Sequence, residues 1–379
     1  MTEYRRLDEI CNINMGQSPA SDSYNEDGDG LPFFQGNADF GVLYPEVRIW
    51  CNAPTKIVEP ETLLISVRAP IGALNFSRER SCIGRGLAGI TPMPGIELKY
   101  VYYCLKGKNA ELNAKGTGST FKAIAKAALG ETSVRMISQA EQQEIVQMLD
   151  KLSDVIAQRK QQLSALDTLI KARFVELFEC GDHEIVKASD VCDFITKGTT
   201  PPTGEITEEY ENGKIPFLKV YNLSFTGEML FDENPQYILA ETHNGKLARS
   251  KVYPNDVLMN IVGPPLGKFT LVTDEFEEWN INQAIAIFRA KERILPRFLL
   301  HALMQPKVLE PFIGQAVGIR QQNLSLEQCR NLQFPLPSLE EQKSFVEFAE
   351  QLDKSKVAVQ KALAETQTLF DSLLQKYFS

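Results

Sequence analysis

The stretch from Ser138 to Phe178 reads SQAEQQEIVQMLDKLSDVIAQRKQQLSALDTLIKARFVELF. Its apolar residues recur at alternating steps of four and three, the spacing of a coiled-coil seam. The seam residues are Ile145, Leu149, Leu152, Ile156, Leu163, Leu166, Ile170 and Leu177, with Arg159 and Arg173 at the two remaining positions. No glycine or proline interrupts the stretch, and Ser138 with Glu141 has the S-x-x-E pattern of a helix N-terminal capping box. The pattern predicts one long helix that needs a partner helix.

A second copy of the pattern begins two hundred residues later, at Ser338 and Glu341. Its seam residues are Phe345, Ala349, Leu352, Val359, Leu363, Phe370, Leu373 and Tyr377, with Lys356 and Thr366 in the polar positions. Ten seam positions and a cap that repeat at one offset indicate an internal duplication. We predict that the two helices pair with each other as an antiparallel intramolecular coiled coil, and that the polar seam residues fix its register.

The segments before the two helices also repeat each other in order. The matching pairs are Met15–Pro19 with Lys197–Pro201, Leu31–Gln35 with Ile215–Lys219, Leu63–Gly72 with Val257–Gly267, Cys82–Ile90 with Asn280–Phe288, Tyr100–Leu105 with Phe298–Leu303, and Thr117–Ile124 with Val317–Leu324. Strand, turn and short-helix patterns alternate in both segments, which predicts an α+β fold class with two similar mixed α/β domains separated by the two long helices. We expect the domains at 1–137 and 181–337 and the helices at 138–180 and 338–379.

Composition restricts the class of protein. The 379-residue chain carries a net charge of −9, with 1–137 neutral and 181–337 at −5, which disfavours a free-standing basic nucleic-acid binder. No run of 18 apolar residues and no apolar signal-peptide core are present, so we expect a cytoplasmic protein without membrane spans. The seven scattered cysteines contain no C-x-x-C pair, which favours buried thiols in a reducing compartment.

Motifs of catalysis were sought and not found. Gly263-Pro-Pro-Leu lacks the polar first residue and aromatic last residue of a methyltransferase pocket for a flipped base. The G-x-x-x-x-G-K-[ST] phosphate loop is absent, and Gly116–Thr120 has no lysine before its hydroxyl. No spacing of cysteine and histidine supports a nucleophile pair or a metal site. We therefore propose no catalytic residue and no metal ligand.

Two short motifs complete the pattern of repeats and paired helices. They are G-S-T-F-x-x-I at Gly118–Ile124 and P-L-P-x-x-x-E-Q at Pro335–Gln342. Together with the order of segments, they resemble the specificity subunit of type I restriction–modification systems over essentially the whole chain. The first copy departs from the second motif with Arg135-Met-Ile, and the second copy replaces G-S-T-F with Gly318-Ile-Arg-Gln.

The resemblance implies a DNA-recognition subunit without catalysis of its own. Each domain would read one half of a bipartite double-stranded DNA target, and the helices would set the gap and dock two methyltransferase subunits. Restriction subunits would join to cut. The cofactors, S-adenosylmethionine with ATP and Mg for restriction, would be bound by those partner subunits and none by this chain.

Candidate DNA-binding residues are polar side chains in equivalent turns of the two domains. Arginine can pair with guanine, asparagine and glutamine with adenine, and cations and hydroxyls with phosphate. In the first domain these are Gln35, Asn37, Arg68, Arg78, Arg80, Arg85, Lys115, Ser119, Thr120 and Lys122. In the second they are Lys219, Asn222, Lys268, Asn280, Asn282, Gln283, Arg320, Gln321, Gln322 and Asn323. Base contact is favoured most for the sets Arg78–Arg85 and Arg320–Asn323.

Three alternatives remain at the level of sequence. A type IIB-like specificity subunit would use the same recognition with a different catalytic partner. A protein-binding scaffold built on a coiled coil is supported by the acidic second domain. A thiol-dependent enzyme has no supporting motif.

Overall fold

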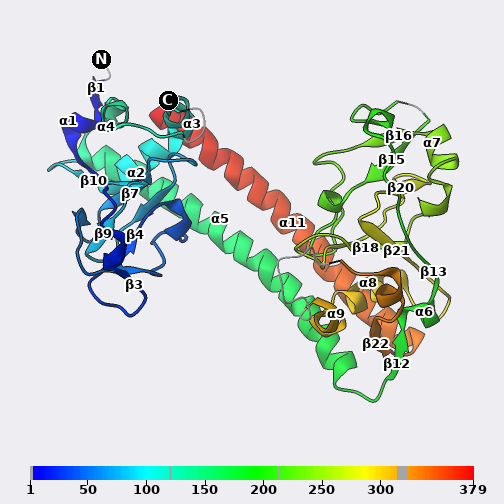
Figure 1. Cartoon of the computed structure of the whole chain (residues 1–379). Helices are drawn as coiled ribbons and strands as arrows, with labels where there is room; N and C mark the ends of the chain where they lie inside the picture. The colour runs from blue at the N-terminus through cyan, green and yellow to red at the C-terminus, as the bar shows by residue number, and fades with distance from the viewer. Residues whose placement is uncertain (1–2, 119–121, 212, 314–322) are drawn as a thin grey trace. The chain divides into compact units, whose positions relative to one another are not determined.

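The computed structural model describes residues 3–118, 122–211, 213–313 and 323–379 (Figure 1). The chain forms two compact units, Met1–Lys160 with Gln360–Ser379, and Gln161–Val359. Each long helix therefore contributes one end to each unit. The predicted α+β class, with two similar mixed domains and two long antiparallel helices, is confirmed.

The first unit contains three sheets. An antiparallel sheet has the strand order β2 (Cys11–Met15), β10 (Leu87–Pro92), β7 (Leu63–Ser66), β8 (Leu74–Phe76). A mixed sheet has the order β3 (Tyr24–Asn25), β5 (Trp50–Cys51), β4 (Leu31–Phe34), β9 (Ser81–Ile83), β6 (Ile57–Val58), with β4 and β9 parallel. A pair joins β1 (Glu3–Arg6) to β11 (Ser133–Met136). The short helices are α1 (Leu7–Ile10), α2 (Leu98–Gly107), α3 (Asn109–Ala114) and α4 (Lys126–Gly130).

The second unit repeats these sheets strand for strand. The antiparallel sheet is β13 (Cys192–Lys197), β21 (Ile285–Ala290), β18 (Val257–Asn260), β19 (Phe269–Leu271). The mixed sheet is β14 (Ile206–Thr207), β16 (Tyr237–Leu239), β15 (Lys214–Leu218), β20 (Trp279–Ile281), β17 (Lys251–Val252), and β15 is parallel to β20. The pair is β12 (Glu184–Lys187) with β22 (Gln333–Leu336). Helices α6 (Ala188–Val191), α7 (Ala240–Asn244), α8 (Pro296–Leu303), α9 (Pro306–Ile313) and α10 (Leu326–Arg330) complete it.

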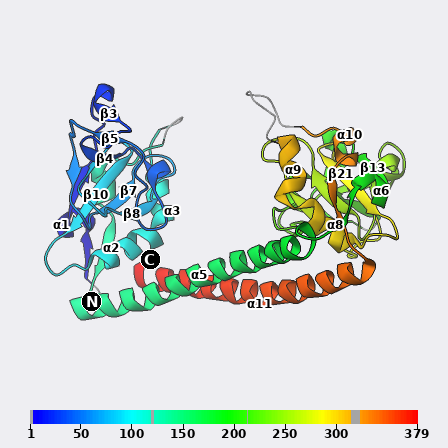
Figure 2. The same ribbon diagram turned by 90° about the horizontal axis from the view of Figure 1, so that it is seen from below.

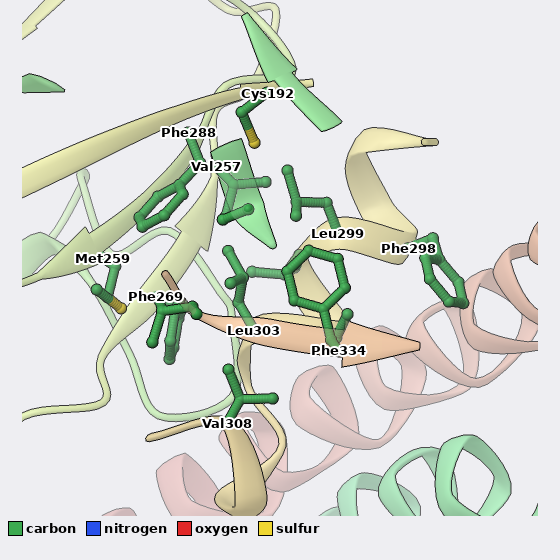
Figure 3. Packing of buried hydrophobic residues seen from close by; sticks show 14 of the residues in the cluster. Cys192, Val257, Met259, Phe269, Phe288, Phe298, Leu299, Leu303, Val308 and Phe334 are labelled. Carbon is green, nitrogen blue, oxygen red and sulfur yellow. The ribbon is translucent and has the colours of Figure 1, made fainter. Parts of the chain in front are cut away.

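Each unit has its main core between the antiparallel sheet and the helices. Strands β7 and β18 are buried at every residue, because sheet partners flank them and apolar groups cover both faces. In the second unit Phe269 and Phe288 from the sheet and Phe298 and Leu303 from α8 belong to one core cluster (Figure 3). In the first unit Phe370, Leu374 and Phe378 of the last helix join the equivalent core.

The long helices begin where the sequence predicts. In α5 (Gln139–Phe174) the Glu141 N–H donates to Ser138 Oγ over 3.3 Å, and the Ser138 N–H donates to the Glu141 carboxylate over 3.0 Å. The same two bonds at Ser338 and Glu341 begin α11 (Leu339–Phe378). A short π-helix, η3 (Val175–Glu179), follows α5. No helix in the described part of the chain is long and apolar enough to span a membrane.

Figure 2 shows the ribbons of the two long helices, α5 and α11. Three of the four polar seam residues, Arg159, Thr366 and Lys356, bond across the helix pair, whereas Arg173 pairs with Glu176 three residues further along the chain. In the first unit the Arg159 guanidinium donates to the Ala362 carbonyl and the Thr366 hydroxyl. In the second, Lys356 is 5% exposed and its Nζ lies 2.5 Å from Asp167 Oδ1. Arg159 of α5 pairs with Thr366 of α11, and the later α5 residue Asp167 pairs with the earlier α11 residue Lys356, so the helices are antiparallel. The predicted register role of these positions is supported by these contacts.

Candidate nucleic-acid interface

A sharp turn follows the central strand of the antiparallel sheet in both units. Ala69–Pro70 and Pro264–Pro265 are both cis peptides, and Gly72 and Gly267 both have positive φ angles of 88° and 97°. A polar side chain from the strand end closes each turn. Ser66 Oγ donates to the Pro70 carbonyl and accepts from the Ala73 N–H, and Asn260 makes the matching two bonds to Pro265 and Lys268.

Three further loops are joined to this turn by backbone hydrogen bonds in the first unit. The Ala69 N–H donates to the Lys122 carbonyl over 3.1 Å, and the Val67 N–H donates to Gly86 over 2.8 Å. The Gly86 N–H in turn donates to the Gln35 carbonyl over 3.1 Å. The loops after β4, β7 and β9 therefore meet the segment around Lys122. We call this set of residues, 15–18, 34–37, 67–72, 84–86 and 122–124, the first loop cluster.

The second unit builds an equivalent loop cluster from residues 197–200, 218–222, 261–267, 282–284 and 323–324. The Ile261 N–H donates to Ala284 over 2.8 Å, the Leu324 N–H donates to Ile261 over 2.9 Å, and the Asn282 N–H donates to Leu218 over 3.0 Å. One close approach recurs in both clusters. A Cβ at Gly16 would lie 2.2 Å from the Gly84 oxygen, and a Cβ at Gly198 would lie 2.2 Å from the Asn282 oxygen. Glycine is required at both positions because no side chain fits there.

The first loop cluster carries free positive charge. Arg68, Arg85 and Lys122 are exposed, and among the described residues none of the three has an ion-pair partner. Gln35 is exposed beside them, and Asn37 is half-buried. Cations on loops with exposed backbone are the groups that contact phosphates, and arginine and glutamine also read base edges. The cluster has the chemistry of a DNA-binding surface.

The second loop cluster presents mainly amides. Gln283 and Asn323 are exposed, and Asn282 and Lys219 are half-buried. Lys268 lies beside the turn, with its Nζ 5.7 Å from the centre of the exposed Phe225 ring. Asn323 also supports the backbone, since its Oδ1 accepts from the Gly263 N–H over 3.4 Å. This surface suits base-edge hydrogen bonding more than phosphate neutralisation.

Two arginines of the predicted set Arg78–Arg85 lie away from the cluster. Arg78 and Arg80 precede β9 and Arg85 follows it, so they lie at opposite ends of this short strand. Arg80 pairs with Glu59 at 3.3 Å, and the Arg78 guanidinium lies 4.5 Å from the Tyr44 ring centre. Of the set Arg78–Arg85, for which contact with DNA was favoured, the structure places only Arg85 in the first loop cluster, and DNA contact by the set remains a prediction.

Two predicted contact residues are buried structural groups. Asn222 is 0% exposed, and its side chain bonds the Lys219 N–H and the Leu230 carbonyl. Asn280 is also 0% exposed, and its amide bonds Ser250, His243 and Leu247. The structure contradicts a DNA-contacting role for both, because their hydrogen-bonding groups are used inside the fold. Lys115 is half-buried and pairs with Glu111 at 2.6 Å.

Five predicted residues lie outside the described part of the chain: Ser119, Thr120, Arg320, Gln321 and Gln322.

The structure adds residues that the sequence did not single out. Arg249, in the short helix η6 (Ala248–Ser250), is exposed and donates to the Thr199 hydroxyl over 2.8 and 3.1 Å. It brings a cation to the second loop cluster from a segment fifty residues away from Thr199. Ser18 and Thr200 fill equivalent positions, since their hydroxyls accept the N–H groups of Arg85 and Gln283. No local motif marks these residues.

The cysteines are structural, as the sequence predicts for most of them. Six are buried, and only Cys180 is exposed. Burial raises the pKa of Cys11, Cys104, Cys192 and Cys329 to about 12, so these thiols stay protonated near neutral pH. They are unsuited to nucleophilic chemistry.

Each copy of the duplicated fold thus carries one polar loop cluster whose exposed side chains suit contact with DNA. The family model described as type I restriction modification DNA specificity domain matches residues 2–167 and again residues 181–366. The chain therefore belongs to this family of DNA specificity domains and contains two copies of the domain.

Individual relatives agree with this assignment. The EcoBI specificity subunit of a type I restriction enzyme from Escherichia coli is 25% identical over 411 residues, covering 98% of this chain and 84% of that protein. The putative MjaX specificity subunit from Methanocaldococcus jannaschii is 39% identical over 156 residues, or 41% of this chain. The matched segment spans 37% of that relative's own length.

Two solved structures share the fold. The S subunit of a type I restriction–modification system from M. genitalium superposes with a TM-score of 0.52 at 16% identity, covering 100% of this chain and 96% of that one. A chain from a study of type I complex assembly and conformational transition gives 0.60 at 17% identity, with coverages of 99% and 97%.

Proposed function

We propose that this chain supplies the target sequence of a type I restriction–modification complex, with each loop cluster reading one half of a bipartite DNA site. One observation carries the proposal. The two clusters share their backbone hydrogen bonds and their cis turns, but they differ in the side chains that they expose. A shared scaffold with different exposed polar groups suits two readers of different sequences.

The two clusters would make different kinds of contact with DNA. In the first, Arg68 and Lys122 would contact phosphates, and Arg85 would bond guanine through two hydrogen bonds. In the second, Gln283 and Asn323 can bond adenine, and Arg249 supplies a phosphate contact. We expect an asymmetric site with unlike halves.

The paired helices would set the distance between the half-sites. Their register is fixed in each unit by a polar layer, Arg159 with Thr366 and Lys356 with Asp167. The chain would bind two methyltransferase subunits, which hold S-adenosylmethionine, and restriction subunits, which use ATP and Mg. We expect this complex in the cytoplasm, where its DNA target lies.

A methylation-protection experiment on random-sequence DNA tests the proposal. With the full chain and its methyltransferase subunits, we expect one asymmetric bipartite motif. Arg85→Ala should relax the motif in one half only, and Gln283→Ala in the other half only, by about 1–3 kcal/mol of base discrimination each. Arg80→Ala is the matched control and should leave both halves unchanged, because Arg80 lies away from the cluster.

A continuous motif, or methylation without sequence preference, contradicts bipartite reading. Equal loss in both halves from Arg85→Ala contradicts the assignment of one half to each cluster.

A further inference from the structure

The second loop cluster continues into a short loop that exposes an aromatic side chain. Residues 223–230 come directly after η5 (Val220–Asn222). The buried Asn222 side chain donates to the Leu230 carbonyl over 3.1 Å, and the Leu230 N–H donates to the Asn222 carbonyl over 2.8 Å, so the two ends of the loop are joined. Between them, Phe225 is 48% exposed. It is the only phenylalanine among the exposed large apolar residues in the described part of the chain.

Hydrogen bonds hold Phe225 beside the cis turn of this cluster. The Ser224 N–H donates to the Phe269 carbonyl over 3.1 Å, and the Phe269 N–H donates to the Ser224 carbonyl over 2.8 Å. The Thr226 N–H donates to Ser224 Oγ over 3.3 Å, which stiffens the loop on the other side of Phe225. Phe269 begins β19, two residues after Gly267 of the turn, and Gly267 and Phe225 line one hollow of about 430 Å³. Phe225 therefore lies at the surface next to the turn.

A cation lies over the exposed ring. Lys268 Nζ is 5.7 Å from the centre of the Phe225 ring, and no salt bridge among the described residues uses Lys268. Its charge is therefore available to a ligand. A cation beside an apolar ring suits DNA, because the cation can contact a phosphate while the ring contacts an apolar group of a nearby base.

The apolar group that a base pair presents in the major groove is the 5-methyl group of thymine. In an A·T pair it lies beside the adenine atoms that asparagine or glutamine can bond. Asn323 is joined to Gly263 at one end of the cis turn, and Phe225 lies next to Gly267 at the other end. The turn thus has an amide at one end and an apolar ring at the other, which is the chemistry that the two bases of an A·T pair require.

We propose that Phe225 is a specificity-determining residue that packs against the 5-methyl group of one thymine in the half-site of the second unit, while Lys268 contacts a neighbouring phosphate. The inference rests on the proposed function, which places that half-site against the second loop cluster. It gives the second unit a way to distinguish bases that uses neither charge nor hydrogen bonding. Burial of one methyl group against the ring supplies the discrimination.

Replacement of thymine by uracil tests the proposal, because it removes the methyl group and leaves base pairing unchanged. The full chain with its methyltransferase subunits is titrated against duplexes that carry its bipartite motif, with each thymine of the motif replaced in turn by uracil. We expect one replacement, in the half-site that Gln283→Ala relaxes, to weaken binding by about fourfold through the loss of one buried methyl group. Fluorescence anisotropy at a fixed salt concentration measures the affinities.

Variants of the ring then assign the effect to Phe225. Phe225→Ser should bind the thymine and uracil duplexes equally, whereas Phe225→Leu keeps an apolar side chain and should retain the preference for thymine. Lys268→Met should also retain the preference, and should lower the slope of log affinity against log salt by about 0.9. Leu239→Ala is the matched control, since Leu239 is 50% exposed and pairs with Lys214, at the end of β15 remote from the cluster. It should bind like the wild type.

A preference for thymine that persists in Phe225→Ser would overturn the inference. The inference would also be overturned if no uracil replacement in that half-site weakened binding by the wild-type complex. Either result leaves the proposed function intact as long as the complex recognises a bipartite motif. Absence of a bipartite motif with the wild-type complex would overturn the proposed function instead.

Discussion

The two loop clusters share a backbone and differ in chemistry. At the strand end, Ser66 in one unit and Asn260 in the other close the same turn with the same two hydrogen bonds. On the surface, the first cluster has Arg85 where the second has Gln283. A polar residue that bonds the backbone in one unit is thus matched in the other unit by a residue that makes the same bonds. A polar residue that faces solvent is matched by one of different charge and shape. This difference distinguishes the residues that stabilise a cluster from those that can contact DNA bases.

The largest test of this separation compares Asn280 with Gln283. Asn280→Ala removes a buried amide together with its hydrogen bonds to the Ser250 hydroxyl and to His243 Nδ1, so we expect a loss of about 2–3 kcal/mol in the free energy of unfolding. Gln283→Ala changes an exposed side chain and should cost less than about 0.5 kcal/mol. Urea unfolding of the full chain, followed by a probe in the second unit, measures both. Equal stability of the Asn280→Ala and Gln283→Ala variants would contradict the distinction between residues that stabilise the cluster and residues that can contact DNA.

A second difference between the units is sensitive to pH. Burial lowers the pKa of His301 to about 4, whereas the corresponding α2 residue, Tyr103, is buried with a raised pKa and does not titrate in that range. As the pH falls, the histidine is therefore protonated at a higher pH in the unfolded chain than in the folded chain. The buried neutral histidine contributes its full stability above the unfolded pKa of about 6.5. That stability is lost as the pH falls from about 6.5 toward 4.

Replacement of the histidine isolates this effect. Between pH 8 and pH 5 we expect the wild-type second unit to lose about 2 kcal/mol more than His301→Phe. Unfolding midpoints at the two pH values give the comparison. Parallel pH profiles for the two proteins would show that His301 is not buried as a neutral ring.

The smallest effect concerns the unequal charge of the two clusters. Arg68→Ala and Lys122→Ala should each weaken DNA binding by about 1 kcal/mol and reduce the slope of log affinity against log salt by about 0.9, because one phosphate contact is lost. Gln283→Ala should leave the slope unchanged, since a neutral side chain releases no counterion. Fluorescence anisotropy with a DNA duplex at several salt concentrations tests this, with Arg80→Ala as the control. An equal change of slope for Arg68→Ala and Gln283→Ala would contradict the charge difference.

The helices and the repeat were predictable because their signals are periodic or local. The capping boxes at Ser138 and Ser338 involve residues three apart, and the seam follows from helical spacing. The turn at Arg68–Gly72 was marked by its proline and glycine. Such features do not depend on how distant parts of the chain meet.

The failures depended on distant contacts. Arg78, Arg80 and Arg85 are close in sequence, but β9 separates them in space. Asn280 and Gln283 are both polar and three residues apart, and only the positions of His243 and Ser250 decide which amide is buried. Arg249 reaches the second cluster through Thr199, a contact that no spacing in the sequence indicates.

The composition of the first unit has a consequence for biosynthesis. Its core contains Phe370, Leu374 and Phe378, and the Phe378 ring lies 5.1 Å from the Tyr100 ring centre. These residues are synthesised about two hundred residues after the rest of the unit, which ends at Lys160. At about 5–20 residues per second, the N-terminal domain waits roughly 10–40 seconds for the helix that completes its core. During that interval an apolar surface of the nascent chain is uncovered, so synthesis of the second long helix is the step that completes the first unit.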